Sequence, residues 1–339
     1  MQLLRKESGT VAAVTAAEHE QRQLRSLWLK LVFLALIGGA LIALFLTINV
    51  TDWGFALPRR GRKVVAMLLV GFAVAYSSVM FQTITNNRIL TPSIIGFDSM
   101  YMLIQTVIVY LFGGITLAMM SRELLFVINV GLMVLFASLL YRWLFRREGR
   151  NLYFLVLIGI IFGTLFGSFT SFMQRMIDPN DFTVLQDRMF ASFNSVNEDL
   201  LLIASAAIVL VTLYSLRFLR SLDVVLLGRD QAINLGVAHA NLVNRCMVVI
   251  AVLISVSTAL VGPITFFGLL VANLAYQYMH TYRHAFVVPA ASLISVIALV
   301  GGQLLVERVF TFSTSLSVII NFIGGIYFLY FLLRETRRD

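Results

Sequence analysis

Apolar runs of 18 or more residues recur along the whole of this 339-residue chain. A run of about 20 apolar residues is long enough to cross the hydrocarbon core of a bilayer as a helix, in which every backbone polar group is hydrogen-bonded internally. A membrane β-barrel would instead show alternation in segments of about ten residues. The sequence therefore predicts an all-α polytopic membrane protein.

The runs predict ten membrane-spanning helices with both termini on one side. Residues 27–334 form the predicted transmembrane domain, residues 1–26 a cytoplasmic extension that is helical or disordered, and residues 335–339 a cytoplasmic C-terminus. The predicted spans are 27–50, 62–83, 93–113, 124–145, 152–174, 199–216, 243–261, 264–279, 285–304 and 316–334.

The charges indicate which way the chain is inserted. With the N-terminus inside, 18 of the 26 lysines and arginines fall on the cytoplasmic side, as the positive-inside rule requires. The run Arg59, Arg60, Arg62 and Lys63 is the exception, because it falls outside. Either the overall bias tolerates one such loop, or the predicted topology is wrong there, or these charges meet an acidic partner. The net charge of +9 is explained by this flanking pattern and by anionic lipid, rather than by nucleic acid.

Several chemistries are excluded by what the sequence lacks. It has no GxxxxGK[ST], HExxH or EF-hand pattern, and its single cysteine, Cys246, rules out an internal disulfide. The four histidines (His19, His239, His280 and His284) lie in or beside cytoplasmic segments and do not converge on a buried site. No catalytic or metal site is therefore expected.

Acidic residues inside the predicted spans are scarce. Asp98, near the start of the third span, is explained by the favourable field at a helix N-terminus. An ion-coupled secondary transporter usually needs buried carboxylates, so it stays as the alternative to transport driven by another energy source.

Three features stand out in the apolar background. Residues 228–241 form a polar, glycine-punctuated segment that suits docking to a partner, and Gly262-Pro263 interrupts the apolar sequence shortly before Gly268. Glycines at 159, 163 and 167 recur on one face of the fifth span. They predict either close packing within the subunit or the border of a transport pathway.

Five elements in order resemble the permease subunits of ABC importers for iron–siderophore complexes, haem and vitamin B12 (FecCD-type). They are LPRR (57–60), QTITNNRILTPSIIG (82–96), LGRDQAINLGV (227–237), GPITFFGLLVANLAY (262–276) and GIYFLYFLL (325–333). The resemblance covers nearly the whole chain from about residue 27. It implies a type II ABC importer permease fold in the bacterial inner membrane.

The resemblance also implies roles for individual residues. The cytoplasmic segment would couple to an ATPase subunit that binds ATP and Mg²⁺, so that no cofactor is expected in this chain. Arg59, Arg60 and Arg308 would dock a periplasmic or lipid-anchored binding protein, whose charge pairs set orientation and association rate. The implied coupling residues are Gly228, Arg229, Asp230, Ala232, Leu235, Gly236 and Val237, and the implied pathway or hinge residues are Gly159, Gly163, Gly167, Gly262, Pro263 and Gly268.

Departures from the family pattern point to one of its branches. Ala272-Asn273 replaces Pro-His, Tyr276 replaces an arginine, Arg229 stands where an acidic residue is usual, and Tyr327 replaces a proline. These changes resemble the branch that carries catechol-type siderophores and pairs with a second, non-identical permease. A ferric siderophore is the expected substrate, with haem or a cobalamin-like chelate as alternatives.

Overall fold

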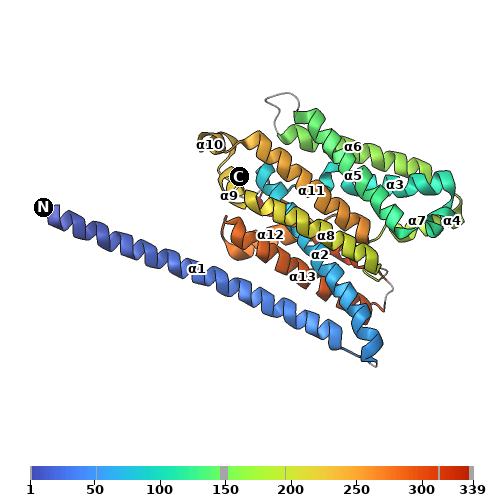
Figure 1. Ribbon diagram of the computed structural model, residues 1–339, viewed down its shortest axis with the longest axis horizontal. Helices are drawn as coiled ribbons and strands as arrows, with labels where there is room; N and C mark the ends of the chain where they lie inside the picture. The colour runs from blue at the N-terminus through green and yellow to red at the C-terminus, as the bar shows by residue number, and fades with distance from the viewer. Residues whose placement is uncertain (1, 51, 146–151, 195, 312–313, 336–339) are drawn as a thin grey trace.

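The computed structural model describes residues 2–50, 52–145, 152–194, 196–311 and 314–335. Apart from its first residue, the predicted tail 335–339 lies outside these ranges. Within them the chain forms a bundle of helices and contains no strand (Figure 1).

Ten helices coincide with the ten predicted spans. Seven of them are long and apolar enough to cross a membrane, whereas α3, α12 and the described part of α14 are shorter. The polytopic all-α class is therefore confirmed, and the number of spans remains a prediction. The helices are α1 (Gln2–Thr47), α2 (Trp53–Thr85), α3 (Phe97–Phe112), α5 (Arg122–Phe145), α6 (Leu152–Gln174), α8 (Glu198–Ser215), α11 (His239–Val261), α12 (Phe267–Met279), α13 (His284–Arg308) and α14 (Leu316–Glu335).

The remaining elements are short and lie between these helices. We call the end of the bundle where α1 ends and α2 begins the outer end, and the end that carries α9 and α10 the inner end. The short elements are η1 (Pro92–Ile95), α4 (Gly114–Met119), α7 (Pro179–Arg188), η2 (Leu216–Phe218), α9 (Leu219–Val225) and α10 (Arg229–Asn234).

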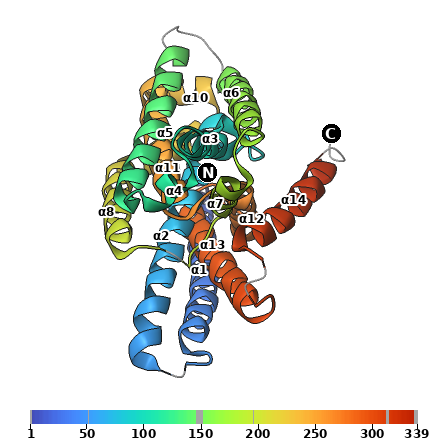
Figure 2. The ribbon, with the colours of Figure 1, turned by 90° about the vertical axis from the view of Figure 1, so that its right-hand side faces the viewer.

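Helices α2 and α11 form the centre of the bundle. In each of them 72% of the most apolar window is buried inside the protein, against 22% for α1 and α6. Helix α2 packs against α11, α12 and α13, and α11 packs against α5 and α8. Helices α1 and α14 are peripheral, and Figure 2 shows α14 projecting at an angle beside α12 and α13.

The basic run at the outer end is helical, which corrects the predicted loop before the second span. Helix α2 begins at Trp53 rather than at residue 62, because the Asp52 side chain accepts a hydrogen bond from the Gly54 N–H at 2.9 Å and caps the helix. Pro58 lies inside the helix and removes only the bond to the carbonyl four residues earlier. Arg59 and its basic neighbours therefore project from helical turns.

The N-terminal extension is helical and continuous with the first span. Helix α1 runs without a break from Gln2 to Thr47. Its C-terminal half packs along α13 and α2, and its N-terminal half extends away from the bundle (Figure 1). Of the two alternatives for the extension, the helix is the one found over residues 2–26.

Candidate functional site

The segment between α8 and α11, which is predicted to be cytoplasmic, folds into α9 and α10, which we call the coupling element. Gly228 (φ +102°) precedes α10, and Gly236 (φ +86°) follows it. Both φ values lie in the region that side chains with a Cβ rarely adopt, so glycine allows the chain to turn sharply at each end. Glycine therefore marks both ends of α10 with a tight turn.

Ala232 and Leu235 do not share a face, although they lie three residues apart. Ala232 is fully buried, whereas Leu235 is 64% exposed. Helix α10 ends at Asn234, and Leu235 has left helical geometry with φ −82° and ψ 8°. The rule that residues three apart lie on one helical face therefore no longer applies to this pair.

The coupling element presents an apolar surface to the inner side. Leu227, Ile233 and Leu235 are all exposed, and the neighbouring Arg229 and Asp230 are exposed as well. An apolar centre with a charged rim is the usual composition of a protein interface. Sequence reasoning missed Leu227 and Ile233, although exposed leucine and isoleucine beside a glycine turn could have identified them.

The coupling element is tied to the bundle by its other side. Helix α9 packs against α2 and α13, and α10 packs against α9 and α11. The half-buried Val237 joins the core, and its N–H donates to the Ala232 carbonyl at 3.0 Å. The element is therefore held by the central helices and not only by its own chain connections.

His284 is buried, whereas the sequence indicated that none of the four histidines belongs to a buried site. At the start of α13 it is 1% exposed, and its Nδ1 lies 2.5 Å from Asp223 Oδ1 of α9. Among the described residues, no three histidine, cysteine or acidic side chains gather closely enough to hold a metal ion. One histidine is nevertheless buried in a polar contact with the coupling element.

At the outer end the three predicted docking arginines have different environments. The Arg60 guanidinium donates to the carbonyls of Phe45, Leu46 and Ile48 at 3.1, 3.2 and 2.8 Å. These groups belong to the end of α1, where carbonyls lack helical partners. Arg60 therefore caps α1.

Arg59 and Arg308 are exposed at the same end. Arg59 projects from α2 into solvent, and Arg308 donates one hydrogen bond to the Ile48 carbonyl at 3.1 Å. Both keep an accessible cationic surface, and both lie near the end of α1. The structure thus brings together the two arginines that the sequence placed about 250 residues apart in the chain.

A buried ion pair joins α2 and α13 beside these arginines. Lys63 Nζ lies 2.9 Å from Glu307 Oε1, and both side chains are about nine-tenths buried. Gln303 donates to the same Glu307 oxygen at 2.9 Å. Breaking one partner of such a pair is costly because the other charge is left buried.

Gly262 and Pro263 end the helix α11 ahead of α12, as predicted. Gly262 has φ +100°, and a Cβ there would lie 3.1 Å from Ala191 Cα. The Ser192 N–H donates to the Val261 carbonyl at 2.8 Å, which satisfies a group freed at the helix end. The break is packed against residues 190–192.

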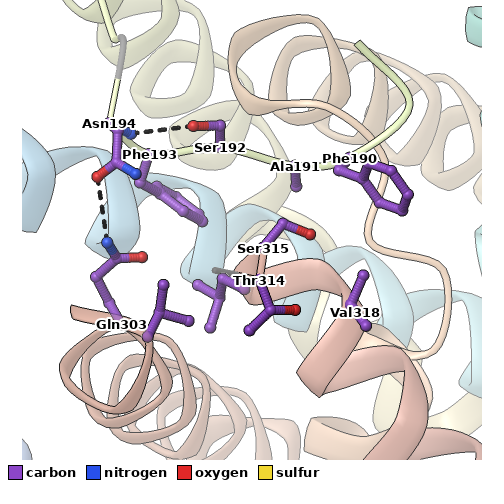
Figure 3. Close-up of a pocket in the computed structure, with 11 residues that line it drawn as sticks. Phe190, Ala191, Ser192, Phe193, Asn194, Gln303, Thr314, Ser315 and Val318 are labelled. Carbon is purple, nitrogen blue, oxygen red and sulfur yellow. Dashed lines mark hydrogen bonds between the residues drawn. The ribbon is translucent and has the colours of Figure 1, made fainter. Parts of the chain in front are cut away.

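Two cavities lie on either side of this packed segment. One, of about 460 Å³, is lined by the segment itself and by residues of α13 and α14, and Figure 3 shows Gln303 hydrogen-bonded to Asn194 across it. The other, of about 700 Å³, is bordered by Gly262 and by Gln105 and Asn129. Phe190, Ser192 and Ser315 line both cavities.

The glycines of α6 divide into two groups. A Cβ at Gly159 would lie 2.8 Å from Ile95 Cα, and one at Gly163 would lie 3.3 Å from Gly96 Cα. These two glycines bring α6 against η1 and the start of α3, so close packing within the subunit accounts for them. A Cβ at Gly167 would meet no atom of the described residues within 4 Å.

Gly268 and Asp98 also have local structural explanations. A Cβ at Gly268 would collide with Ser78 of α2, so this glycine allows α12 to approach the centre of the bundle. Asp98 lies in the first turn of α3, as expected, and its carboxyl group lies beside the side chains of Thr265 and Ser93. It therefore lies between α3 and the broken segment that joins α11 to α12.

These features define a class of protein. Helices that cross a membrane, a coupling element with an apolar contact surface at one end, and cavities beside a broken helix are those of a transporter subunit and not of an enzyme. The chain matches the FecCD transport family over residues 24–334, and it belongs to that family. It is an integral membrane permease of the ABC importer type.

Individual relatives agree with this assignment. The chain is 54% identical to the petrobactin import system permease protein YclO of Bacillus subtilis, over 91% of this chain and 98% of that protein. It is 38% identical to the petrobactin import system permease protein FatC of Bacillus anthracis, over 82% and 78%. A solved metal-chelate type ABC transporter in an inward-facing conformation has the same fold, with a TM-score of 0.79, 21% identity, and 91% and 99% coverage.

Proposed function

We propose that this chain is the transmembrane permease of an ATP-driven importer that moves a ferric-siderophore complex across the bacterial inner membrane by alternating access. The coupling element carries the proposal, because it offers an apolar contact surface in a chain whose sequence has no nucleotide-binding motif. The petrobactin permeases among the relatives support a siderophore as the substrate.

The coupling element is the proposed docking site of an ATPase subunit that binds ATP and Mg²⁺. Leu235, with its exposed apolar neighbours, and the charged Arg229 and Asp230 form the contact surface. Gly228 and Gly236 shape its turns, and Ala232 and Val237 anchor it to the bundle. Movement of the ATPase would then be passed to the permease at this surface.

A second permease, non-identical to this chain, is the proposed partner within the membrane. Gly167 on α6 faces open space, and Phe169 and Phe172 are exposed on other sides of the same helix. A helix with an open glycine and exposed aromatic rings suits close packing with another helix as well as contact with lipid. The transport pathway would lie between the two permeases.

A periplasmic or lipid-anchored binding protein is the proposed partner at the outer end. Arg59 and Arg308 are the accessible cations there, and acidic groups on the binding protein would meet them. Arg60 supports the surface indirectly, because it fixes the end of α1 beside them.

The test is an uptake panel in a strain that lacks this chain, complemented with the wild type. Radiolabelled ferric petrobactin, a second ferric catecholate, haem and cobalamin are supplied in turn. We expect uptake of a ferric siderophore that stops when ATP is depleted and the proton gradient is preserved. Uptake that follows the gradient instead would favour the ion-coupled alternative, and uptake of haem or cobalamin alone would replace the substrate.

A further inference from the structure

A chain of polar contacts connects the coupling element to the centre of the bundle. It starts at Asp223 on α9, passes through His284 at the start of α13, and reaches Thr83 in the last turn of α2. The three residues lie on three different elements, and Asp223 and His284 are 61 positions apart in the sequence.

Asp223 holds the start of α13 at two points. Its Oδ1 accepts from the His284 backbone N–H at 2.8 Å and lies 2.5 Å from His284 Nδ1. Arg283, the residue that precedes α13, makes no side-chain cap of its own. A carboxylate at a helix N-terminus satisfies an unpaired N–H and interacts favourably with the helix dipole. Asp223 therefore caps α13 from another helix.

The other ring nitrogen of His284 contacts α2. This Nε2 lies 2.7 Å from Thr83 Oγ1, which also lies 2.8 Å from the Val79 carbonyl. Thr83 has one hydroxyl proton, which it can donate to the Val79 carbonyl or to a ring nitrogen that lacks a proton. In either case the contact joins the start of α13 to the last turn of α2.

The contacts extend to α12. Thr83 Oγ1 lies 3.5 Å from the Tyr276 hydroxyl, and the Tyr276 ring lies 4.8 Å from the guanidinium carbon of Arg88. The Arg88 carbonyl accepts from Gln82 at 2.8 Å and from Asn273 at 2.9 Å. Asn273 and Tyr276 are two of the positions at which the sequence departs from the family pattern.

Buried, directional contacts transmit displacement differently from apolar packing. Apolar packing has no preferred direction, whereas a buried hydrogen bond that is broken leaves its polar groups unpaired and is therefore costly to break. Asp223, His284 and Thr83 each bridge a boundary between elements. Moving α9 without α13 and α2 would break these bonds.

We propose that His284 is a positioning residue, which links the coupling element to α2, α12 and α13 so that movement driven by the ATPase reaches the transport pathway. This inference rests on the proposed function. It assigns to the Asp223–His284–Thr83 chain the transmission of motion, in addition to the stability of the fold.

The experiment uses the complete importer, reconstituted in lipid vesicles with its ATPase, second permease and binding protein. ATP hydrolysis and accumulation of radiolabelled ferric petrobactin are measured in the same vesicles. Thr83→Val keeps the shape of the side chain and removes the hydroxyl that His284 contacts. We expect ATP hydrolysis to continue and the number of complexes transported per ATP to fall about tenfold.

Conservative and control variants separate this role from simple destabilisation. Thr83→Ser restores the hydroxyl and is expected to restore the transport-to-hydrolysis ratio. His284→Gln, which cannot reach Asp223 and Thr83 together, is expected to lower the ratio as Thr83→Val does. His280→Asn changes an exposed histidine in a left-handed conformation that asparagine also adopts, and it is expected to behave as wild type.

The double variant Asp223→Asn with Thr83→Val tests whether the two residues act through the same chain of contacts. Residues that act through one chain show non-additive effects, so we expect the double variant to be little worse than Thr83→Val alone. Wild-type ratios in both Thr83→Val and His284→Gln would overturn the proposal. Failure of the wild-type importer to accumulate any siderophore with ATP would instead refute the proposed function.

Discussion

Adjacent arginines at the outer end have different physical roles. Arg60 donates to three carbonyls at the end of α1, and its guanidinium is partly shielded by them. Arg59, one residue earlier and about 100° around the helix, is exposed. A single helical step therefore separates a residue that stabilises the fold from one that can meet a partner.

Replacing each arginine should have separate effects. We expect Arg60→Ala to lower the free energy of unfolding by about 1–3 kcal/mol, because buried carbonyls lose a charged donor. Arg59→Glu combined with Arg308→Glu should raise the dissociation constant of the binding protein and should cost less stability than Arg60→Ala, because only the single hydrogen bond from Arg308 to Ile48 is lost. Thermal unfolding in detergent and binding-protein titration provide the two measurements, and Arg59→Gln is the matched control. Equal effects of the two changes on docking would contradict this division.

Gly236 is the second residue for which the backbone conformation gives a specific prediction. At φ +86° a side chain with a Cβ is strained by about 1–2 kcal/mol, although the space around it is open. We expect Gly236→Trp to abolish uptake, because it distorts and covers the contact surface, while the chain still inserts into the membrane.

Uptake and membrane content are measured together for this variant. Gly131→Ala is its control, since Gly131 lies within α5 at ordinary φ with open space around it. Normal uptake by well-expressed Gly236→Trp would show that the coupling element is not the ATPase contact.

At the scale of elements, glycine determines how closely α6 approaches its neighbours. Gly159 lies against Ile95 of η1, and Gly163 lies against Gly96, where the chain turns into α3. Gly167, one turn further along, faces open space. The same spacing of glycines thus serves contact within the subunit at one end and an open surface at the other.

Alanine substitutions should distinguish these positions. Gly159→Ala places a methyl group 2.8 Å from Ile95 Cα, and we expect it to destabilise the protein by about 1–3 kcal/mol. Gly167→Ala should be neutral or stabilising, because alanine favours helix and its methyl group would extend into open space. Midpoints of thermal unfolding in detergent provide the comparison. A similar loss for both variants would show that the backbone, and not the contact, is responsible.

The elements differ in how far the sequence could predict them. Long apolar helices such as α11 were placed within a few residues, because length and hydropathy are local properties. Helices α9 and α10 were not, since short helices are stabilised mainly by tertiary packing. The contact of Asp223 with His284 was also beyond prediction, because it joins residues distant in sequence. Leu235 is exposed because α10 ends at Asn234, one residue before it. No pattern in the composition marks that helix end, so the exposure could not be predicted.

At the scale of the whole molecule, the predicted orientation places α9 and α10 in the cytoplasm and Arg59 outside. The native Cys246 is fully buried and has little background reactivity toward a polar reagent. The protein therefore suits labelling of introduced cysteines.

We expect Arg59→Cys to react with a membrane-impermeant maleimide on spheroplasts. Leu235→Cys, which is exposed at the inner end, should react only after the membrane is permeabilised. The unmodified chain serves as the background control. The opposite pattern of labelling would reverse the predicted topology and exchange the proposed positions of the ATPase and the binding protein.

The Lys63–Glu307 pair joins α2 and α13 and therefore limits how far these two helices can move relative to each other. Together with Arg60 and Arg308 it fastens α1, α2 and α13 at the outer end, while Asp223 and His284 fasten α13 at the inner end. Because these contacts tie the three helices to one another, we expect α1, α2 and α13 to move together as one rigid group. Structures of different states should superpose closely within this group, and its displacement relative to α3, α6 and α7 should report the transmitted movement.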